Sequence, residues 1–395
     1  MLQGLRQQCL LVTHAWVSQL AEGVLRPDSS ICVPLDGIEL AKWDTGEVTT
    51  RTAANPVGKQ NAVHHGDMQL ALLDRAKERS NIEIRLGAAV IDVDVEKNAV
   101  LLSEGQRIDG FDLIIGADGV KSTIKAKVCD SEAAQAKPTG EAAYRFTLDR
   151  RALESDEELL ALVQRPWAVR WDGPSRHVVA YPVRNHERLN VVLIHPDSGK
   201  ERDDEGDDEN DDAAESWTSM ASKHDVVADY QGWNATLLKL IVLAPADVPN
   251  FRMFAHLPSP AWFKGSTILL GDACHAMLPY LGQGIAQAVD DTAAIVAVLS
   301  LIQRREQLPL ALQAYETSRK GRVEQIQAAT LQAREHLHLK DAEAQAARDL
   351  KRKKAVEAGE NSDVVKMQQS YWEWNAAEVA RCTLVELMEN AARDR

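Results

Sequence analysis

Two aspartates, Asp118 and Asp272, each follow a short apolar run that ends in glycine. The runs cover residues 113–116 and 268–271, and both have the composition of strands buried inside a parallel sheet. Open α/β sheets bind ligands beyond the carboxyl ends of their strands. We therefore expect the two segments, about 150 residues apart, to converge on one ligand. Asp272 is the candidate acceptor for the hydroxyl groups of a polyol.

A glycine pair follows the second aspartate and precedes a predicted helix over about residues 284–302. Gly282 and Gly284 lack a Cβ, so the backbone at both positions can approach a flat ring closely. The start of the helix, at Gly284 and Ile285, carries the positive end of the helix dipole and can stabilise negative charge on such a ring. This segment is therefore a candidate cofactor site.

The sequence resembles a known family in these and other segments. Residues 271–291 are similar to the second FAD signature of the para-hydroxybenzoate hydroxylase superfamily, in its salicylate-hydroxylase-like branch of FAD-dependent aromatic hydroxylases. Residues 112–119 resemble the Asp-Gly motif of that family, and residues 63–68 resemble its His-Arg-Ala-Asp-Leu element. With further matches in family order, the resemblance covers roughly residues 33–380.

The resemblance implies an FAD-dependent monooxygenase. NADPH or NADH would reduce FAD, and the reduced cofactor would use O2 to hydroxylate an aromatic or polyketide-like small molecule of secondary metabolism. The implied cofactor contacts are His65, Asp118, Asp272, Gly282, Gly284 and Ile285. The implied catalytic residues are Arg145 and Tyr181, which would face the substrate, with Arg145 the first candidate for orienting the substrate or stabilising its charge. No metal site is expected.

Two features depart from the family pattern. No early pair of glycines has the Gly-x-Gly-x-x-Gly spacing that holds the FAD pyrophosphate, so the resemblance implies a chain without that leading segment. His65 stands where relatives place an arginine, and an imidazole does not replace a guanidinium fork. Two alternatives stay open, and the missing segment motivates the first of them. One is a flavin-free binding or scaffold protein, and the other is a flavin dehydrogenase or oxidase.

The predicted fold class is α/β, with an incomplete FAD/NAD(P)-binding Rossmann-like domain interlocked with a substrate domain built on a β-sheet. The FAD-binding domain is expected over residues 31–136 and 253–330, and the substrate-binding domain over 137–252. Short strands are expected at 82–86, 90–95 and 100–102. Residues 1–30 have the apolar pattern of an atypical N-terminal helix, and residues 331–395 form a helical C-terminal region. Within that region we expect His336, His338 and the basic residues 351–354 at the surface.

Composition narrows the possible partners. The net charge of −14 disfavours nucleic acid, which requires clustered basic residues. Residues 201–215 contain ten acidic residues and one arginine, so we expect a solvated loop there. The five cysteines are scattered and indicate free thiols. No apolar run approaches the ~20 residues of a membrane span, and the first residues do not resemble a signal peptide, so we expect a cytoplasmic protein.

Overall fold

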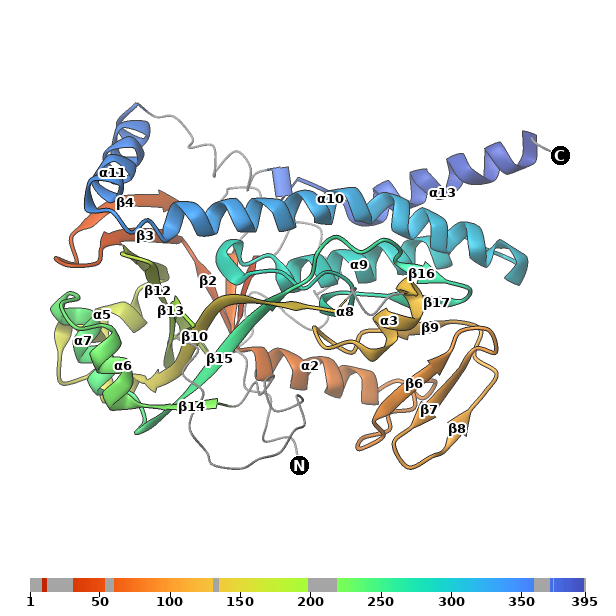
Figure 1. The fold of residues 1–395 in the computed structure, drawn as a ribbon, viewed down its shortest axis with the longest axis horizontal. Helices are drawn as coiled ribbons and strands as arrows, with labels where there is room; N and C mark the ends of the chain where they lie inside the picture. The colour runs from red at the N-terminus through yellow and green to blue at the C-terminus, as the bar shows by residue number, and fades with distance from the viewer. Residues whose placement is uncertain are drawn as a thin grey trace.

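The computed structural model describes residues 9–12, 31–53, 60–130, 135–197, 219–358, 370–371 and 373–393. The acidic loop predicted at 201–215 lies outside these residues, as does most of the helix predicted for residues 1–30. The described chain contains two main α/β units, which share the long helix α10 (Leu308–Leu337) (Figure 1). This arrangement confirms the predicted mixed α/β class with a helical C-terminal region.

The larger unit is built on an eight-stranded sheet. Its strand order is β14-β15-β10-β13-β12-β11-β3-β4, and every neighbouring pair is antiparallel except β11 and β3. The strands are β3 (Gly37–Lys42), β4 (Val48–Ala53), β10 (Lys137–Asp149), β11 (Trp167–Gly173), β12 (Arg176–Val183), β13 (Arg188–Pro196), β14 (Ser219–Ser222) and β15 (Asp247–Ala255). Residues 37–53, which the sequence grouped with the FAD-binding part, thus extend the sheet of the expected substrate domain. The remaining domain limits stay predictions.

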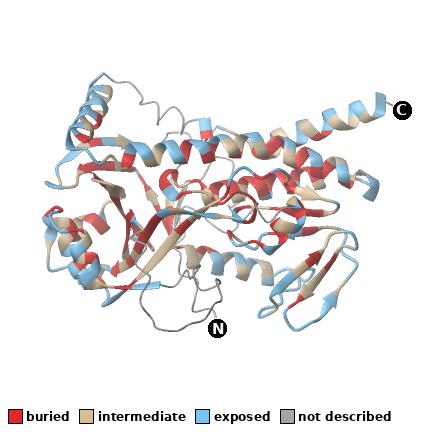
Figure 2. Cartoon of the chain, viewed as in Figure 1, coloured by how far each residue is buried: buried red, intermediate tan, exposed pale blue. Residues whose placement is uncertain are grey.

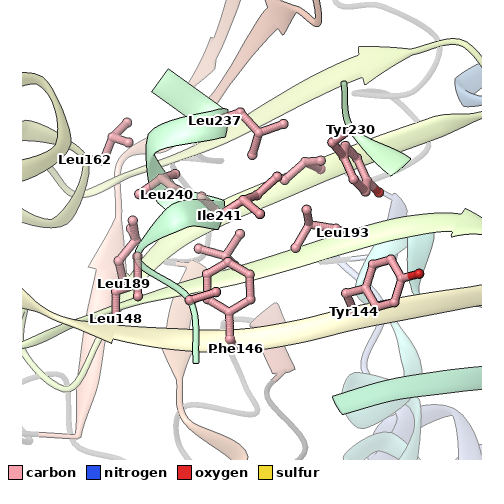
Figure 3. Close-up of a cluster of buried hydrophobic side chains, with 14 of the residues drawn as sticks. Tyr144, Phe146, Leu148, Leu162, Leu189, Leu193, Tyr230, Leu237, Leu240 and Ile241 are labelled. Carbon is pink, nitrogen blue, oxygen red and sulfur yellow. The ribbon is translucent and has the colours of Figure 1, made fainter. Parts of the chain in front are cut away.

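One face of this sheet is covered by four helices, and the alternation of β10 explains why. Tyr144, Phe146 and Leu148 pack on this face against Leu240 and Ile241 of α7 (Figure 3). The intervening Arg145 therefore points to the opposite face, because successive side chains of a strand alternate. The covering helices are α4 (Arg150–Leu153), α5 (Glu157–Gln164), α6 (Lys223–Asp229) and α7 (Ala235–Val242).

The second unit contains the smaller sheet β16-β17-β9, in which β17 (Thr267–Leu269) and β9 (Ile114–Gly116) are parallel. Strand β16 (Phe263–Lys264) completes the sheet. The hydrophobic core of the second unit lies between this sheet and the helices. Figure 2 shows buried residues concentrated along α9 and α10. The helical elements are α3 (Thr123–Cys129), α8 (Asp272–His275), η3 (Pro279–Leu281), α9 (Gly284–Leu299), η4 (Arg305–Gln307) and α13 (Ala376–Arg393). Helix α11 (Ala342–Glu357) instead lies against β4 of the larger sheet.

Two small sheets complete the described chain, and the first corrects a prediction. Strand β1 (Cys9–Val12) pairs with β5, so the helix expected over residues 1–30 is wrong at these four residues. Four residues with apolar side chains suit a strand as well as a helix, and pairing with β5 decides between them. The first sheet is β1, β5 (Gln60–Val63) and β2 (Cys32–Leu35), followed by α2 (His65–Lys77). The second is β6 (Val90–Asp94), β7 (Ala99–Leu102) and β8 (Arg107–Ile108).

The strand predicted at residues 82–86 is absent, and the strand that ends at Gly116 forms but is less buried than expected. Residues 82–86 form no strand, although Ile82, Ile84 and Leu86 alternate with polar residues, and all three side chains are exposed. Ile115 of β9, expected to be buried on both faces of the sheet, is 45% exposed. In the described chain β9 has one strand neighbour, β17, and residues 82–86 pair with no strand.

Among the helices of the described ranges, none has the length and apolar character to cross a membrane.

Candidate cofactor and substrate site

The two strands that run into glycine and aspartate lie side by side. Ile115 of β9 pairs with Ile268 of β17, and the strands run in the same direction. Leu270 donates its backbone N–H to the carbonyl oxygen of Gly116 over 3.0 Å. The chain segments that carry Asp118 and Asp272 therefore leave the same edge of one sheet, as the sequence predicts.

The turn between β17 and Asp272 requires glycine. Gly271 has φ of 61°, in the region that side chains disfavour, and a Cβ there would lie 3.1 Å from the Cβ of Ala288 on α9. Its backbone N–H donates to Oδ2 of Asp291 over 3.0 Å. This contact fixes the position at which α8 begins with Asp272.

The surroundings of Asp272 indicate a recess in the surface. Its side chain keeps exposed area, yet the surrounding protein desolvates the carboxylate enough to raise its pKa, against the opposing effect of His275 and His65. A group that is both accessible and closely surrounded by protein lies in a concave site. An acceptor in this position suits the hydroxyl groups of a bound polyol.

A buried network of hydrogen bonds and ion pairs around Asp291 fixes the turn at Gly271. Asp291 accepts hydrogen bonds at 2.7 Å from Nε2 of His275 and at 2.9 Å from Nε of Arg319 on α10. Burial opposes ionisation of Asp291, but the charges of His275 and Arg319 outweigh it and lower its pKa to about 2. Asp291 therefore stays ionised at neutral pH, and its contacts join α8, α9 and α10 beneath Asp272.

The predicted glycine pair adjoins the same recess. Gly282 has φ of 63° and ends η3, and Gly284 begins α9. A Cβ on Gly284 would lie 4.0 Å from Oδ1 of Asp272, so the start of α9 and the carboxylate are neighbours. Gln283, at the N-cap of α9, makes no side-chain cap hydrogen bond. The first N–H groups of α9 therefore remain available to an electron-rich ligand.

His65, the first residue of α2, lies near Asp272 and Arg145. Burial lowers the pKa of His65, the charge of Asp272 opposes this, and the charge of Arg145 adds to it. The imidazole is therefore neutral at pH 7. Its Nδ1 is buried, with no hydrogen-bond partner in the described chain. Such an atom favours a ligand that supplies the partner.

Asp118 has a structural contact as well. Its Oδ2 accepts hydrogen bonds from the backbone N–H groups of Thr123 at 2.9 Å and Ile124 at 3.3 Å, at the start of α3. The carboxylate thus satisfies N–H groups that a helix start leaves unpaired. The adjacent Gly119 has φ of 83° and open space where a Cβ would stand. A cofactor contact at Asp118 remains a prediction.

The face of the large sheet opposite the four helices carries the predicted catalytic residues, and β2, β5 and the end of α10 cover part of it. Arg145 pairs across the sheet with Val192, and Thr147 and Tyr181 both pair with Asn190 in the next row. The guanidinium of Arg145 lies 5.6 Å from the ring centre of Phe251. Tyr181 is buried in an apolar cluster with residues of β2 and β5. Arg145 and Tyr181 share this face, but they occupy different rows.

Sequence reasoning missed His177, which lies four residues before Tyr181 and therefore on the same face of β12. The alternation of residues 176–183 was the signal that could have found it. Nδ1 of His177 is 2.7 Å from Nε2 of His338. The side chain of His338 is only 9% exposed, because α10 ends against β10 and β12, so the surface position expected for it is wrong. His336 is exposed, as expected.

The fold is that of an α/β protein, and the arrangement around Asp272 suits a flavin-type nucleotide. The unpartnered Nδ1 of His65, the Asp272 recess and the close Gly284 fit a flat ring with a polyol arm. Residues 61–330 match the family model described as an FAD binding domain. The chain is 68% identical to the FAD-dependent monooxygenase atnJ of Arthrinium sp and 67% identical to the FAD-dependent monooxygenase ntnJ of Nectria sp. Each match spans 376 residues, or 95% of this chain and 86% of the relative.

Solved structures support the fold. A salicylate hydroxylase substrate complex has a TM-score of 0.75 at 19% identity and covers 95% of this chain and 90% of its own. CtdE in complex with FAD and a substrate has a TM-score of 0.79 at 18% identity and covers 99% and 92%. The chain belongs to the FAD-dependent monooxygenases of the aromatic hydroxylase family.

Proposed function

We propose that this monooxygenase hydroxylates an aromatic or polyketide-like small molecule of secondary metabolism, with NADPH or NADH as the electron donor and O2 as co-substrate. The observation that carries the proposal is the electrostatic proximity of His65 to both Asp272 and Arg145. His65 thus lies between the Asp272 recess and the sheet face that carries Arg145. A ring bound on that face would lie beside a flavin held by the recess.

FAD, when bound, supplies electron transfer from NAD(P)H and the activation of O2. Asp272 would hold the ribityl hydroxyl groups, and His65 Nδ1 would gain a hydrogen-bond partner from the cofactor. Gly282, Gly284 and Ile285 would line the ring at the start of α9. Asp118 would contact the cofactor beyond β9.

The sheet face would bind and prepare the substrate. Arg145 would orient the substrate and stabilise negative charge on it, with Tyr181 at the far row of the site. Nδ1 of His177 is engaged by His338, which leaves Nε2 as the nitrogen that can accept a proton from a substrate hydroxyl. Loss of that proton would make the ring electron-rich. The cytoplasmic location expected from the sequence stays a prediction.

The flavin-free scaffold alternative is not favoured, because relatives more than two-thirds identical are named FAD-dependent monooxygenases. The dehydrogenase or oxidase alternative is tested by product analysis. The purified protein should retain absorbance between about 350 and 500 nm after incubation with FAD and removal of the unbound FAD. With NADPH, ¹⁸O₂ and a panel of phenolic acids and aromatic polyketides, one compound should gain a single ¹⁸O atom. Peroxide formation from O2 with no labelled product from any compound would favour an oxidase.

A further inference from the structure

Four titratable side chains form a continuous buried chain between the substrate sheet and the loop before α9. Nδ1 of His177 lies 2.7 Å from Nε2 of His338, and Nδ1 of His338 lies 2.6 Å from Oε1 of Glu141. The hydroxyl of Tyr280 donates to the other oxygen of Glu141. The four residues come from β12, the C-cap of α10, β10 and η3. No local sequence motif links them.

Glu141 is the fixed negative charge of this chain. Burial opposes its ionisation, but hydrogen bonds from His338 and Tyr280 and the charges of His338 and Arg334 keep its pKa below the usual value. Nε of Arg334 lies 3.1 Å from Oε2 of Glu141. Glu141 is therefore ionised at neutral pH and can hold a positive charge on His338.

His177, in contrast to Glu141, is held in its neutral form by its surroundings. Burial lowers its pKa well below the ordinary value, and the charges of His338 and Arg170 add to that effect, while Asp172 opposes it. Asp172 is itself paired with Arg170 and Arg352. A proton that arrives at His177 is therefore unstable there, and the next group in the chain lies within hydrogen-bond distance.

We propose that His338, held by Glu141, takes up the proton that a substrate hydroxyl gives to His177. This inference rests on the proposed function, because it assumes that an aromatic hydroxyl is deprotonated on this sheet face. Before the transfer, His338 donates from Nδ1 to Glu141, and its Nε2 accepts the N–H of His177 Nδ1. The substrate proton adds to Nε2 of His177. The Nδ1 proton of His177 then passes to Nε2 of His338.

The transfer conserves charge and atoms. The substrate becomes an oxyanion, His177 remains neutral with its proton moved from Nδ1 to Nε2, and His338 becomes an imidazolium beside the Glu141 carboxylate. No oxidant or reductant takes part. A lone buried histidine would have to carry the positive charge itself, whereas this arrangement moves it to the ion pair.

The distinguishing measurement is the protonation state of the two histidines. FAD-loaded protein labelled with ¹⁵N-histidine is titrated, and long-range ¹H–¹⁵N spectra are recorded, with signals assigned from the single variants His177→Phe and His338→Gln. As the pH falls, both nitrogens of His338 should become protonated. At the same midpoint His177 should stay neutral and exchange its Nδ1–H form for its Nε2–H form.

Variants test the role of the carboxylate. Glu141→Gln should lower the midpoint of His338 by roughly one pH unit or more, because the amide carries no charge. His336→Gln and Glu335→Gln alter exposed positions on the same helix end and should leave the midpoint unchanged. The proposal is overturned if His177 keeps one tautomer throughout the titration or becomes a cation before His338. An unchanged midpoint in Glu141→Gln also overturns it.

If Glu141→Gln does not fold, the histidine titration of the wild-type protein still tests the proposed proton transfer. Because the spectra require no turnover, the two proposals can fail separately. The tautomer exchange without ¹⁸O-labelled product would contradict the proposed function alone. Labelled product with a fixed His177 tautomer would contradict this inference alone.

Discussion

The backbone N–H of Leu270 donates to the carbonyl oxygen of Gly116 over 3.0 Å, and this bond joins two strand ends that lie far apart in the sequence. The bond continues the parallel pairing of β9 and β17 by one step. It places the turn that leads to Asp272 next to the turn that leads to Asp118. The position of the cofactor recess therefore depends on sheet pairing and not on either motif alone.

Replacing Asp272 with alanine should weaken FAD binding by about tenfold to a hundredfold, since hydrogen bonds to a charged acceptor contribute about 1.5–3 kcal/mol. The fold should persist, because the Asp272 side chain is exposed and Gly271 is held by Asp291. The flavin absorbance per protein and an FAD titration measure the effect. Asp112→Ala, at an exposed residue near β9, is the matched control. Equal flavin content in Asp272→Ala and wild type would contradict the assignment.

Replacing Arg145 with alanine should leave the flavin content unchanged and reduce hydroxylation by about a hundredfold through loss of substrate orientation. Steady-state rates of NADPH oxidation and product formation measure the change. Arg188→Ala is the control, because this arginine lies on the same sheet and pairs with the exposed Asp149. A variant that loses flavin together with activity would place Arg145 in the cofactor site.

Asp290→Asn should stabilise the protein increasingly as the pH rises. Burial, with the charge of Asp291, raises the pKa of Asp290 to about 7 against the effect of Arg319. Because this folded-state pKa lies above the unfolded value of 3.8, the contribution of the carboxyl group to stability is complete below that value and is lost as the pH rises through about 7. The neutral amide avoids this loss.

The gain of Asp290→Asn over wild type should therefore grow between about pH 4 and pH 7 and reach about 4 kcal/mol. Urea unfolding across this range measures it. Asp44→Asn, at an exposed turn, should show no such trend. A gain that is constant with pH, or that shrinks as the pH rises, would show that Asp290 is ionised in the folded protein throughout.

Arg352→Ala should destabilise the protein by about 2 kcal/mol, because Nη1 of Arg352 donates to Oδ2 of the buried Asp172 over 2.7 Å. The loss is limited because Arg170 still pairs with Asp172. Urea unfolding gives the free energy, and limited proteolysis within α11 reports detachment of that helix. Lys351→Ala, at the exposed neighbouring position, should match wild type. Equal stability of both variants would mean that α11 docks without this ion pair.

The parts of the site that were predictable are those that local sequence encodes. A strand that ends in glycine and aspartate is a contiguous pattern, and the adjacency of Asp118 and Asp272 follows from pairing two such strands. The positions of Gly282 and Gly284 before α9 are encoded in the same way. Regular alternation of β10 puts Arg145 on the face opposite the four helices, and its catalytic role stays a prediction.

The contacts that the sequence did not predict depend on where the long helices α10 and α11 lie against the sheet. Arg352 belongs to a basic run expected at the surface, but α11 folds back on the sheet and brings it to Asp172. His338 contacts Glu141 only because the C-terminal end of α10 lies against β10, although the two residues are nearly two hundred positions apart in the sequence. Spacing within either helix contains no signal of these contacts. Residues 82–86 show the converse, because their strand-like pattern has no partner strand in the described chain.

Helix α10 has 30 residues, which corresponds to a length of about 45 Å. Arg319 anchors one part of it beneath the Asp272 turn, and His338 anchors its end against the large sheet. A hinge motion that separated the two units would have to bend α10 or break the contacts of Arg319 or His338.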